Sequence, residues 1–191
     1  MHVMKIEDIC KELPSLETNR TLLRKLSLDD ADDIFEYASE PEIAQYVPWE
    51  YHRSIEDTLT FLNSVIEKYR QNQNAEWGIV LKDNNKLIGS IGFHWWSIEH
   101  ASAEIGYALS KQYWGHGIMS EVLHEVIRFG FSNMKLNRIE ARTRVENTAS
   151  QNVLKRAGMT YEGTIREQFF TKGEYRDFMM YSILRKEYNK R

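Results

Sequence analysis

The sequence contains one cysteine, three prolines and no long apolar run, and its positive and negative charges nearly balance. Cys10 cannot form an intramolecular disulfide, and no residue near it has the spacing of a metal ligand. No apolar segment approaches the roughly 18 residues that are needed to cross a bilayer. Residues 1–11 also lack the basic-then-apolar order of a signal peptide. These absences predict a cytoplasmic protein.

The charge balance excludes broad classes of partner. Lysine and arginine together number 25 against 28 aspartates and glutamates, which gives a net charge of −3. Such a balance provides no general positive field for nucleic acid or an anionic membrane, so neither is expected as a partner and any anion must be bound locally. The six histidines show no metal-ligand spacing, so no metal site is predicted.

One mixed α/β domain over residues 1–191 is predicted, with residues 1–16 less clearly defined, because 42% of the residues are hydrophobic and no linker or repeat divides the chain. After a first strand over 20–27, two Ser-x-x-Asp capping boxes, at Ser27 and Ser54, open helices. The later patterns predict strands over 77–81, 87–95 and 102–109, a helix over 118–131, a strand over 138–145, a helix over 148–157, and strands over 161–170 and 175–184. The order is β-α-α-β-β-β-α-β-α-β-β.

The strand over 138–145 has the clearest alternation of the chain. Every odd-numbered residue is apolar or threonine and every even-numbered one is charged, so one face is expected to be buried and the other to meet water or an anion. Its arginines Arg138, Arg142 and Arg144 form a basic strip that is either solvated or close to a phosphate. Residues 41–48, which begin and end with proline, are predicted to form a loop.

The segment from Leu109 to Ser120 is the most informative part of the sequence. It leaves a predicted strand, contains Gly115 and Gly117, and enters a predicted helix without a single carboxylate. Glycines permit positive φ angles and close approach of the backbone to a ligand, and a helix N-terminus attracts anions, so these properties suit a pyrophosphate. The nucleoside triphosphate motif is absent, and Ser120 replaces the third glycine of the dinucleotide fingerprint. An ordinary glycine turn before a helix is the alternative.

The motif Gln112-x-x-Gly115-x-Gly117 resembles the acyl-CoA pyrophosphate motif of the GNAT superfamily of N-acetyltransferases. Within that superfamily, the chain is similar to the Rim-type ribosomal-protein N-terminal acetyltransferases. Three further stretches support the resemblance, which covers roughly residues 17 to 184: 17–24, 103–109 and 147–158.

The resemblance implies a fold in which the strands that end near Leu109 and Val145 separate, with acetyl-CoA as cosubstrate in the gap. The positions that match the family's cofactor contacts are Leu109, Ser110 and Lys111 for pantetheine, Gln112, Gly115, His116, Gly117, Ile118 and Met119 for the pyrophosphate, and Asn147, Asn152 and Lys155 for pantetheine, the nucleotide end or a phosphate. Asn147 is equally expected to cap the helix that follows it.

Acetyl transfer from a thioester to an amine needs a neutral nucleophile, a stabilised oxyanion and a protonated leaving thiolate. For the thiolate, many relatives use a tyrosine at the position that Leu154 occupies here. Rim-type relatives instead have a serine at the position of Ser150, which is therefore the candidate proton donor. A helix-surface serine without a catalytic role is the alternative.

The general base is less clearly marked. The glutamate that some Rim-type enzymes carry aligns with Phe169, so the resemblance does not supply a base. Glu104 is the predicted substitute, because it alternates with apolar residues on a strand expected to line the cleft. The alternative is a solvated strand carboxylate. Weaker candidates are Glu167, His94 and Tyr175.

Ionisation favours an α-amine as the acceptor. A terminal α-amine with a pKa of about 7.8 is about one-seventh neutral at pH 7, whereas a lysine with a pKa of about 10.4 is neutral about once in 2,500. The difference corresponds to about 3.5 kcal/mol. An enzyme with a poorly marked base therefore fits a protein N-terminus better than a lysine. Aromatic candidates for acceptor binding, with core packing as the alternative, are Tyr46, Trp49, Tyr51, Trp95 and Trp96.

The expected function is direct acetyl transfer from acetyl-CoA to a primary amine in a ternary complex, without a covalent acyl-enzyme. Acetylation of a small-molecule amine, such as an antibiotic or a polyamine, is an alternative that a pocket with several carboxylates would favour. An acyl-CoA-binding module without catalysis and a dinucleotide-binding protein are two further alternatives. A homodimer is compatible with the sequence.

Overall fold

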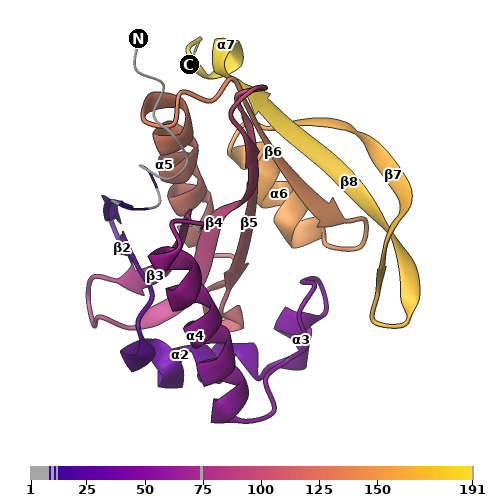
Figure 1. Ribbon diagram of the computed structural model, residues 1–191. Coiled ribbons are helices and arrows are strands. Elements are labelled where there is room, and N and C mark those ends of the chain that lie inside the picture. The colour runs from indigo at the N-terminus through magenta and orange to yellow at the C-terminus, as the bar shows by residue number, and fades with distance from the viewer. Residues whose placement is uncertain (1–8, 10, 12, 74, 191) are drawn as a thin grey trace.

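The computed structural model describes residues 9, 11, 13–73 and 75–190, and it confirms a mixed α/β fold (Figure 1). Cys10 lies outside the described residues. Eight strands form one sheet in the order β1-β2-β3-β4-β5-β6-β8-β7, in which only the β5–β6 pair is parallel. The strands are β1 (Leu16–Glu17), β2 (Thr21–Arg24), β3 (Ala75–Leu81), β4 (Leu87–Ser97), β5 (Ser102–Leu109), β6 (Arg138–Arg144), β7 (Thr160–Thr171) and β8 (Glu174–Leu184).

The helices begin largely where the capping signals predict them. The helical segments are η1 (Leu28–Asp30), α2 (Ala31–Ala38), α3 (Pro41–Ala44), α4 (Ile55–Arg70), η2 (Lys111–Tyr113), α5 (Ile118–Ser132), α6 (Thr148–Arg156) and α7 (Arg185–Tyr188). Both predicted capping boxes are present: the Asp30 carboxylate accepts the backbone N–H of Ser27 at 2.8 Å, and that of Asp57 accepts the N–H of Ser54 at 3.3 Å.

Two local expectations were wrong. Residues 41–48 are not only loop, because Pro41 starts the short helix α3. At the first position of a helix, the fixed φ of proline is already helical and its missing N–H removes no hydrogen bond. The alternation of β6 also fails at its end, since Arg144 is buried whereas Val145 is exposed. Arg144 is tolerated inside because its Nη1 donates to the carbonyl oxygen of Gln45 at 2.7 Å and its guanidinium lies over the ring of Tyr46.

The core lies on both faces of the sheet. On one face Trp77 of β3 is fully buried and contacts the rings of Phe93 on β4 and Phe129 on α5. On the other face α2 packs on β4 and on α4. Figure 1 shows α2 and α4 on a different side of the sheet from α5 and α6. None of the helices in the described ranges has the length and apolar composition that a membrane span requires.

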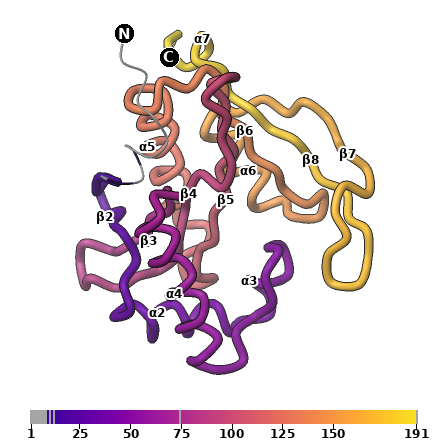
Figure 2. Tube along the Cα trace, in the orientation of Figure 1, coloured from indigo at the N-terminus to yellow at the C-terminus, as the bar shows by residue number. Residues whose placement is uncertain are grey.

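The parallel pair separates soon after it forms, as the resemblance implied. Strands β5 and β6 are paired only from Ser102 to Glu104, opposite Arg138 to Glu140. Beyond that point β5 stays paired with β4 as far as Leu109, while β6 follows β8. The free edge of β5 therefore faces an opening in the sheet. Figure 2 shows α3 and the loop that follows it on the same side of the molecule as the tip of the β7–β8 hairpin.

Candidate functional site

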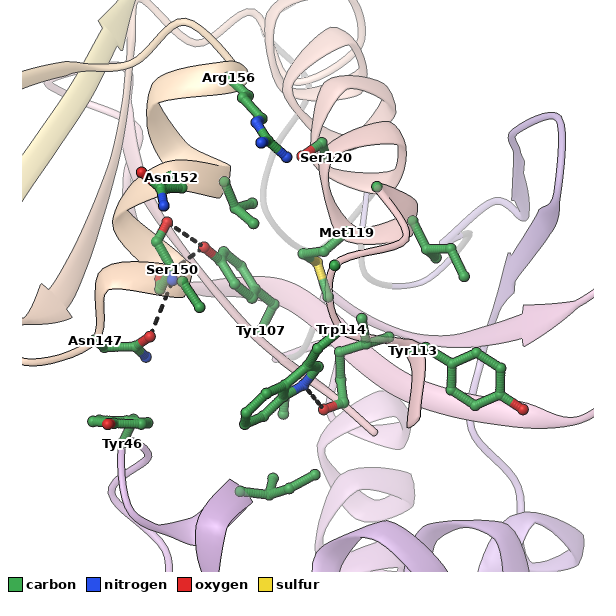
Figure 3. A pocket seen from close by; sticks show the side chains of 18 of the residues that line it. Tyr46, Tyr107, Tyr113, Trp114, Met119, Ser120, Asn147, Ser150, Asn152 and Arg156 are labelled. Atoms are coloured by element: carbon green, nitrogen blue, oxygen red, sulfur yellow. Dashed lines mark hydrogen bonds between the residues drawn. The ribbon is translucent and has the colours of Figure 1, made fainter. Parts of the chain in front are cut away.

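A cavity of about 340 Å³ opens where β5 and β6 separate (Figure 3). Its walls come from α3 and the residues after it, the end of β5, the loop before α5, the first turn of α5, and the length of α6. The lining residues are Ile43, Tyr46, Val47, Tyr107, Ala108, Leu109, Tyr113, Trp114, Gly115, Gly117, Ile118, Met119, Ser120, Asn147, Ala149, Ser150, Asn152, Val153 and Arg156. The walls are mainly apolar, with a few polar groups converging on the cavity, which is typical of a ligand site.

The two glycines of the loop adopt the left-handed backbone conformation that the sequence predicted. Gly115 and Gly117 have φ angles of +78° and +77°, in the left-handed region, and Gly117 is the N-cap of α5. A Cβ atom at Gly115 would have no neighbour within 4 Å, so the loop is open at that point. The N–H groups of Ile118 and Met119 lie in the first helical turn, where no intrahelical partner exists. These N–H groups and the helix dipole point to a phosphate site.

An unexpected arginine supports this loop from the β1–β2 connection. Arg20 Nη1 donates to the carbonyl oxygen of His116 at 2.9 Å, and Arg20 Nε donates to Glu121 Oε2 at 2.9 Å. Its Nη2 atom lies 3.7 Å from the position that a Cβ of Gly117 would take. Burial favours a higher pKa for Glu121, but hydrogen bonds from Thr18 and Arg20 outweigh it and lower that pKa. Arg20 thus fixes the loop and brings a positive charge to it.

Replacing Arg20 with methionine is expected to weaken acetyl-CoA binding about threefold to tenfold, because the loop loses a charged hydrogen bond at a partly exposed position. Calorimetric titration measures the change. Arg70→Met is the matched control, since Arg70 pairs with Glu67 on α4, outside the cavity. Wild-type affinity in the Arg20 variant would show that the contact has no part in binding.

Two hydroxyl groups meet at the other end of the cavity. The Tyr107 hydroxyl on β5 lies 2.9 Å from Ser150 Oγ on α6 (Figure 3). The backbone N–H of Ser150 donates to Asn147 Oδ1 at 3.0 Å, so Asn147 caps α6 as well as lining the cavity. Burial raises the pKa of Tyr107, against the opposing effect of its hydrogen bond with Ser150, so the phenol stays protonated.

The predicted cofactor residues divide into two groups. Those that line the cavity are Leu109, Gly115, Gly117, Ile118, Met119, Asn147 and Asn152, together with the predicted proton donor Ser150. Those outside the lining are Ser110, Lys111, Gln112, His116 and Lys155.

Several groups outside the lining already have partners. The backbone N–H of Ser110 donates to the carbonyl oxygen of Ile88 at 2.7 Å, so it is occupied by the sheet. Lys111 pairs with Glu42, and the side-chain amide of Gln112 donates to Glu36. These side chains are held towards α2 and α3. The sequence motif therefore lies at the cavity, but not every residue of the motif lines it.

The predicted base, Glu104, is held in an ion pair. Arg142 Nε donates to Glu104 Oε1 at 2.7 Å, and Arg142 Nη2 donates to Oε2. The hydrogen bonds to Glu104 raise the pKa of Arg142, and its guanidinium also lies 5.0 Å from the ring centre of Phe169. The other arginines of the β6 strip are likewise paired, Arg138 with Glu140 and Glu162, and Arg144 with Glu146. This strip is therefore a network of ion pairs.

Of the aromatic residues predicted to bind the acceptor, Tyr46 lines the cavity and the other four do not. Trp49 and Trp96 pack partly against the core, and Trp95 and Tyr51 are exposed at the surface. None of the four belongs to the described lining, in which the aromatic residues are Tyr46, Tyr107, Tyr113 and Trp114. The indole Nε1 of Trp114 donates to the carbonyl oxygen of Leu109 at 2.7 Å.

Sequence reasoning also missed Tyr107 and Arg156 as site residues. The signal for Tyr107 was present, since it shares a face of β5 with the buried Ile105. Arg156 extends towards Ser120 at the start of α5, and the buried Ser120 Oγ has no hydrogen-bond partner (Figure 3). Over the same described ranges, no three His, Cys, Asp or Glu side chains gather as a metal site would require.

Comparison with known proteins identifies the family. A family model described as an acetyltransferase (GNAT) domain matches residues 20–160. The chain is 36% identical over 172 residues to the uncharacterized N-acetyltransferase YoaA of Bacillus subtilis (strain 168), which covers 90% of this chain and 97% of that protein. It is 28% identical over 141 residues to the ribosomal-protein-serine acetyltransferase of Escherichia coli (strain K12), covering 73% of this chain and 78% of that enzyme.

The fold agrees with this match. The crystal structure of a GNAT-family acetyltransferase from Bacillus anthracis has a TM-score of 0.81 and 31% sequence identity, covering 91% of this chain and 100% of that one. The separated strands, the glycine loop before α5 and the cavity between them thus occur in a chain whose relatives are acetyltransferases. The chain belongs to the GNAT family and is an acetyl-CoA-dependent N-acetyltransferase.

Proposed function

We propose that this acetyltransferase transfers the acetyl group of acetyl-CoA to the α-amine of a protein N-terminus, by direct attack of the amine in a ternary complex. The amine nitrogen forms a bond to the acetyl carbon while the bond between that carbon and the CoA sulfur breaks. The amine loses a proton to water, and the thiolate is protonated to give CoA. The acetyl donor and the acceptor must therefore meet at the open edge of β5.

The cavity suits acetyl-CoA as the donor. Its phosphates would lie at Gly115, Gly117 and the first N–H groups of α5, with Arg156 as a further cation on the α6 side. The pantetheine arm would follow the apolar wall towards Tyr107. The thioester would then lie near Ser150, whose hydroxyl donates a hydrogen bond to the sulfur as negative charge develops on it.

The single observation that carries the choice of acceptor is the chemistry of the cavity wall. None of the described lining residues is an aspartate, a glutamate or a histidine. Both carboxylate oxygens of Glu104, the base predicted from the sequence, accept hydrogen bonds from Arg142, so proton acceptance there would compete with an ion pair. Such a site favours an amine that is substantially neutral at pH 7, and an α-amine meets that condition far better than a lysine.

The same wall argues against a polyamine, because binding several ammonium groups calls for carboxylates that the described lining lacks. The relative from Escherichia coli, which is named for a ribosomal protein as its acceptor, supports the choice of a protein N-terminus.

Two peptides that differ only in which amine they carry test the proposal. One has a free N-terminus and no lysine, and the other has a blocked N-terminus and a single lysine. The free N-terminus is expected to be acetylated with a kcat/KM at least about tenfold higher, because the neutral fraction differs so strongly. Spermidine serves as the third acceptor. A tenfold preference for the lysine peptide would contradict the proposal, and a preference for spermidine would favour a small-molecule enzyme.

A further inference from the structure

The hydroxyl groups of Tyr107 and Ser150 form a hydrogen bond at one end of the cavity. Tyr107 comes from β5 and Ser150 from the first turn of α6, and both line the cavity. Their oxygen atoms are 2.9 Å apart, so one hydroxyl donates to the other. Only the hydroxyl that accepts keeps its own proton free for a third group. The direction of this hydrogen bond therefore decides what Ser150 can do.

Chemistry and burial favour Tyr107 as the donor. A phenol is a stronger hydrogen-bond donor and a weaker acceptor than an aliphatic alcohol. Burial also keeps the phenol protonated, so that it always has a proton to donate. Donation from Tyr107 leaves the proton of Ser150 unused, and the neighbouring space is the cavity (Figure 3).

The position of Ser150 is fixed independently. Its backbone N–H is held by Asn147 at the N-cap of α6, and the next turn of the helix is anchored by Leu154, which is fully buried. Leu154 brings no polar group to the site. The one side-chain partner that the described structure gives the Ser150 hydroxyl is thus Tyr107.

We propose that Tyr107 is a positioning residue for acetyl transfer, which directs the hydroxyl proton of Ser150 into the cavity towards the thioester sulfur. The inference rests on the proposed role of Ser150 in the reaction. Tyr107 donates to Ser150 Oγ, and Ser150 donates to the sulfur while the carbon–sulfur bond breaks. The proton that finally converts the thiolate to CoA comes from water, so neither hydroxyl is consumed.

Tyr107→Phe tests this role, because it removes one hydroxyl and keeps the ring. The variant is expected to lower kcat about fivefold, which is the effect of losing one neutral hydrogen bond, with little change in the KM for acetyl-CoA. Tyr161→Phe is the matched control: the Tyr161 hydroxyl is 2.8 Å from Thr164 Oγ1 on the β7 edge strand, outside the cavity. It is expected to leave kcat unchanged.

A double variant separates positioning from a structural effect. If Tyr107 acts through Ser150, then Tyr107→Phe does not lower kcat further when Ser150 is already alanine. The double variant then has the same kcat as Ser150→Ala alone. A Tyr107→Phe variant with the kcat of the wild type, or losses that multiply in the double variant, would overturn the inference.

The test of Tyr107 does not depend on which amine is the natural acceptor. CoA release is followed with a thiol reagent, first with the amine that the wild-type protein acetylates fastest and then with water as the acceptor. The identity of the acceptor does not enter either comparison. If the N-terminal peptide proves a poor acceptor, the proposed function fails, while the comparison of the wild-type protein with the variants still decides the role of Tyr107.

Discussion

Gly117→Glu is expected to lower the affinity for acetyl-CoA by about 100-fold or more while the protein stays folded. The substitution places a carboxylate at the N-terminus of α5, where the first backbone N–H groups have no intrahelical partner and where we propose that the phosphates of acetyl-CoA lie. Two negative groups in this small space repel each other by several kcal/mol. The positive φ of +77° adds about 1–2 kcal/mol of strain, which a folded domain tolerates. Calorimetric titration measures the affinity, and circular dichroism checks the fold.

A second glycine separates charge from strain. Gly173 in the β7–β8 turn has a φ of +83° and, like Gly115, no neighbour within 4 Å of a Cβ position. Gly173→Glu therefore imposes the same conformational penalty at a residue outside the described cavity lining, and it is expected to bind acetyl-CoA as the wild-type protein does. An equal loss of affinity in both variants, or none in Gly117→Glu, would contradict the assignment of the loop.

Trp77→Ala is expected to lower the free energy of unfolding by about 3–5 kcal/mol. Trp77 is fully buried, and the centroid of its ring lies 5.5 Å from that of Phe129. This contact packs α5 against the sheet. Its indole Nε1 also donates to the carbonyl oxygen of Pro14 at 2.7 Å. Truncation thus removes a large apolar surface, leaves a cavity and removes the hydrogen bond to Pro14. Urea unfolding provides the measurement.

Trp95→Ala is the control for this variant. Trp95 lies on the neighbouring strand β4 but is 50% exposed, so its removal is expected to change the free energy of unfolding by less than about 0.5 kcal/mol. The same variant also tests whether Trp95 binds the acceptor, as the sequence predicted. If Trp77→Ala lowered the free energy of unfolding no more than Trp95→Ala, the contact of Trp77 with α5 would not be a main source of the protein's stability.

Local signals explain why much of the fold was predictable. The capping boxes at Ser27 and Ser54 are contained within four residues each, so the sequence alone marks where those helices begin. The alternation along β6 has the period of a strand whose odd-numbered side chains are buried. Where a long-range contact intervenes, the pattern misleads, as at Arg144, whose burial depends on a carbonyl 99 residues away.

The site was predictable to the extent that it is local. The glycine loop is one contiguous motif, and its positive φ angles follow from the residue type. The partners of that loop and of Ser150 come from distant segments: Arg20 reaches His116 across 96 residues, and Tyr107 reaches Ser150 across 43. Glu104 illustrates the same limit, because its pairing with Arg142 depends on how β5 and β6 align before they separate.

The most direct test of the account is a calorimetric titration of the wild-type protein with acetyl-CoA, with CoA and NAD as comparators. The cavity at the separated strands and the glycine loop before α5 predict binding of acetyl-CoA in the micromolar range and none of NAD, because the loop lacks the third glycine of a dinucleotide site. Binding of NAD in preference to acetyl-CoA, or no binding of acetyl-CoA, would contradict the assignment of this cavity as the acetyl-donor site.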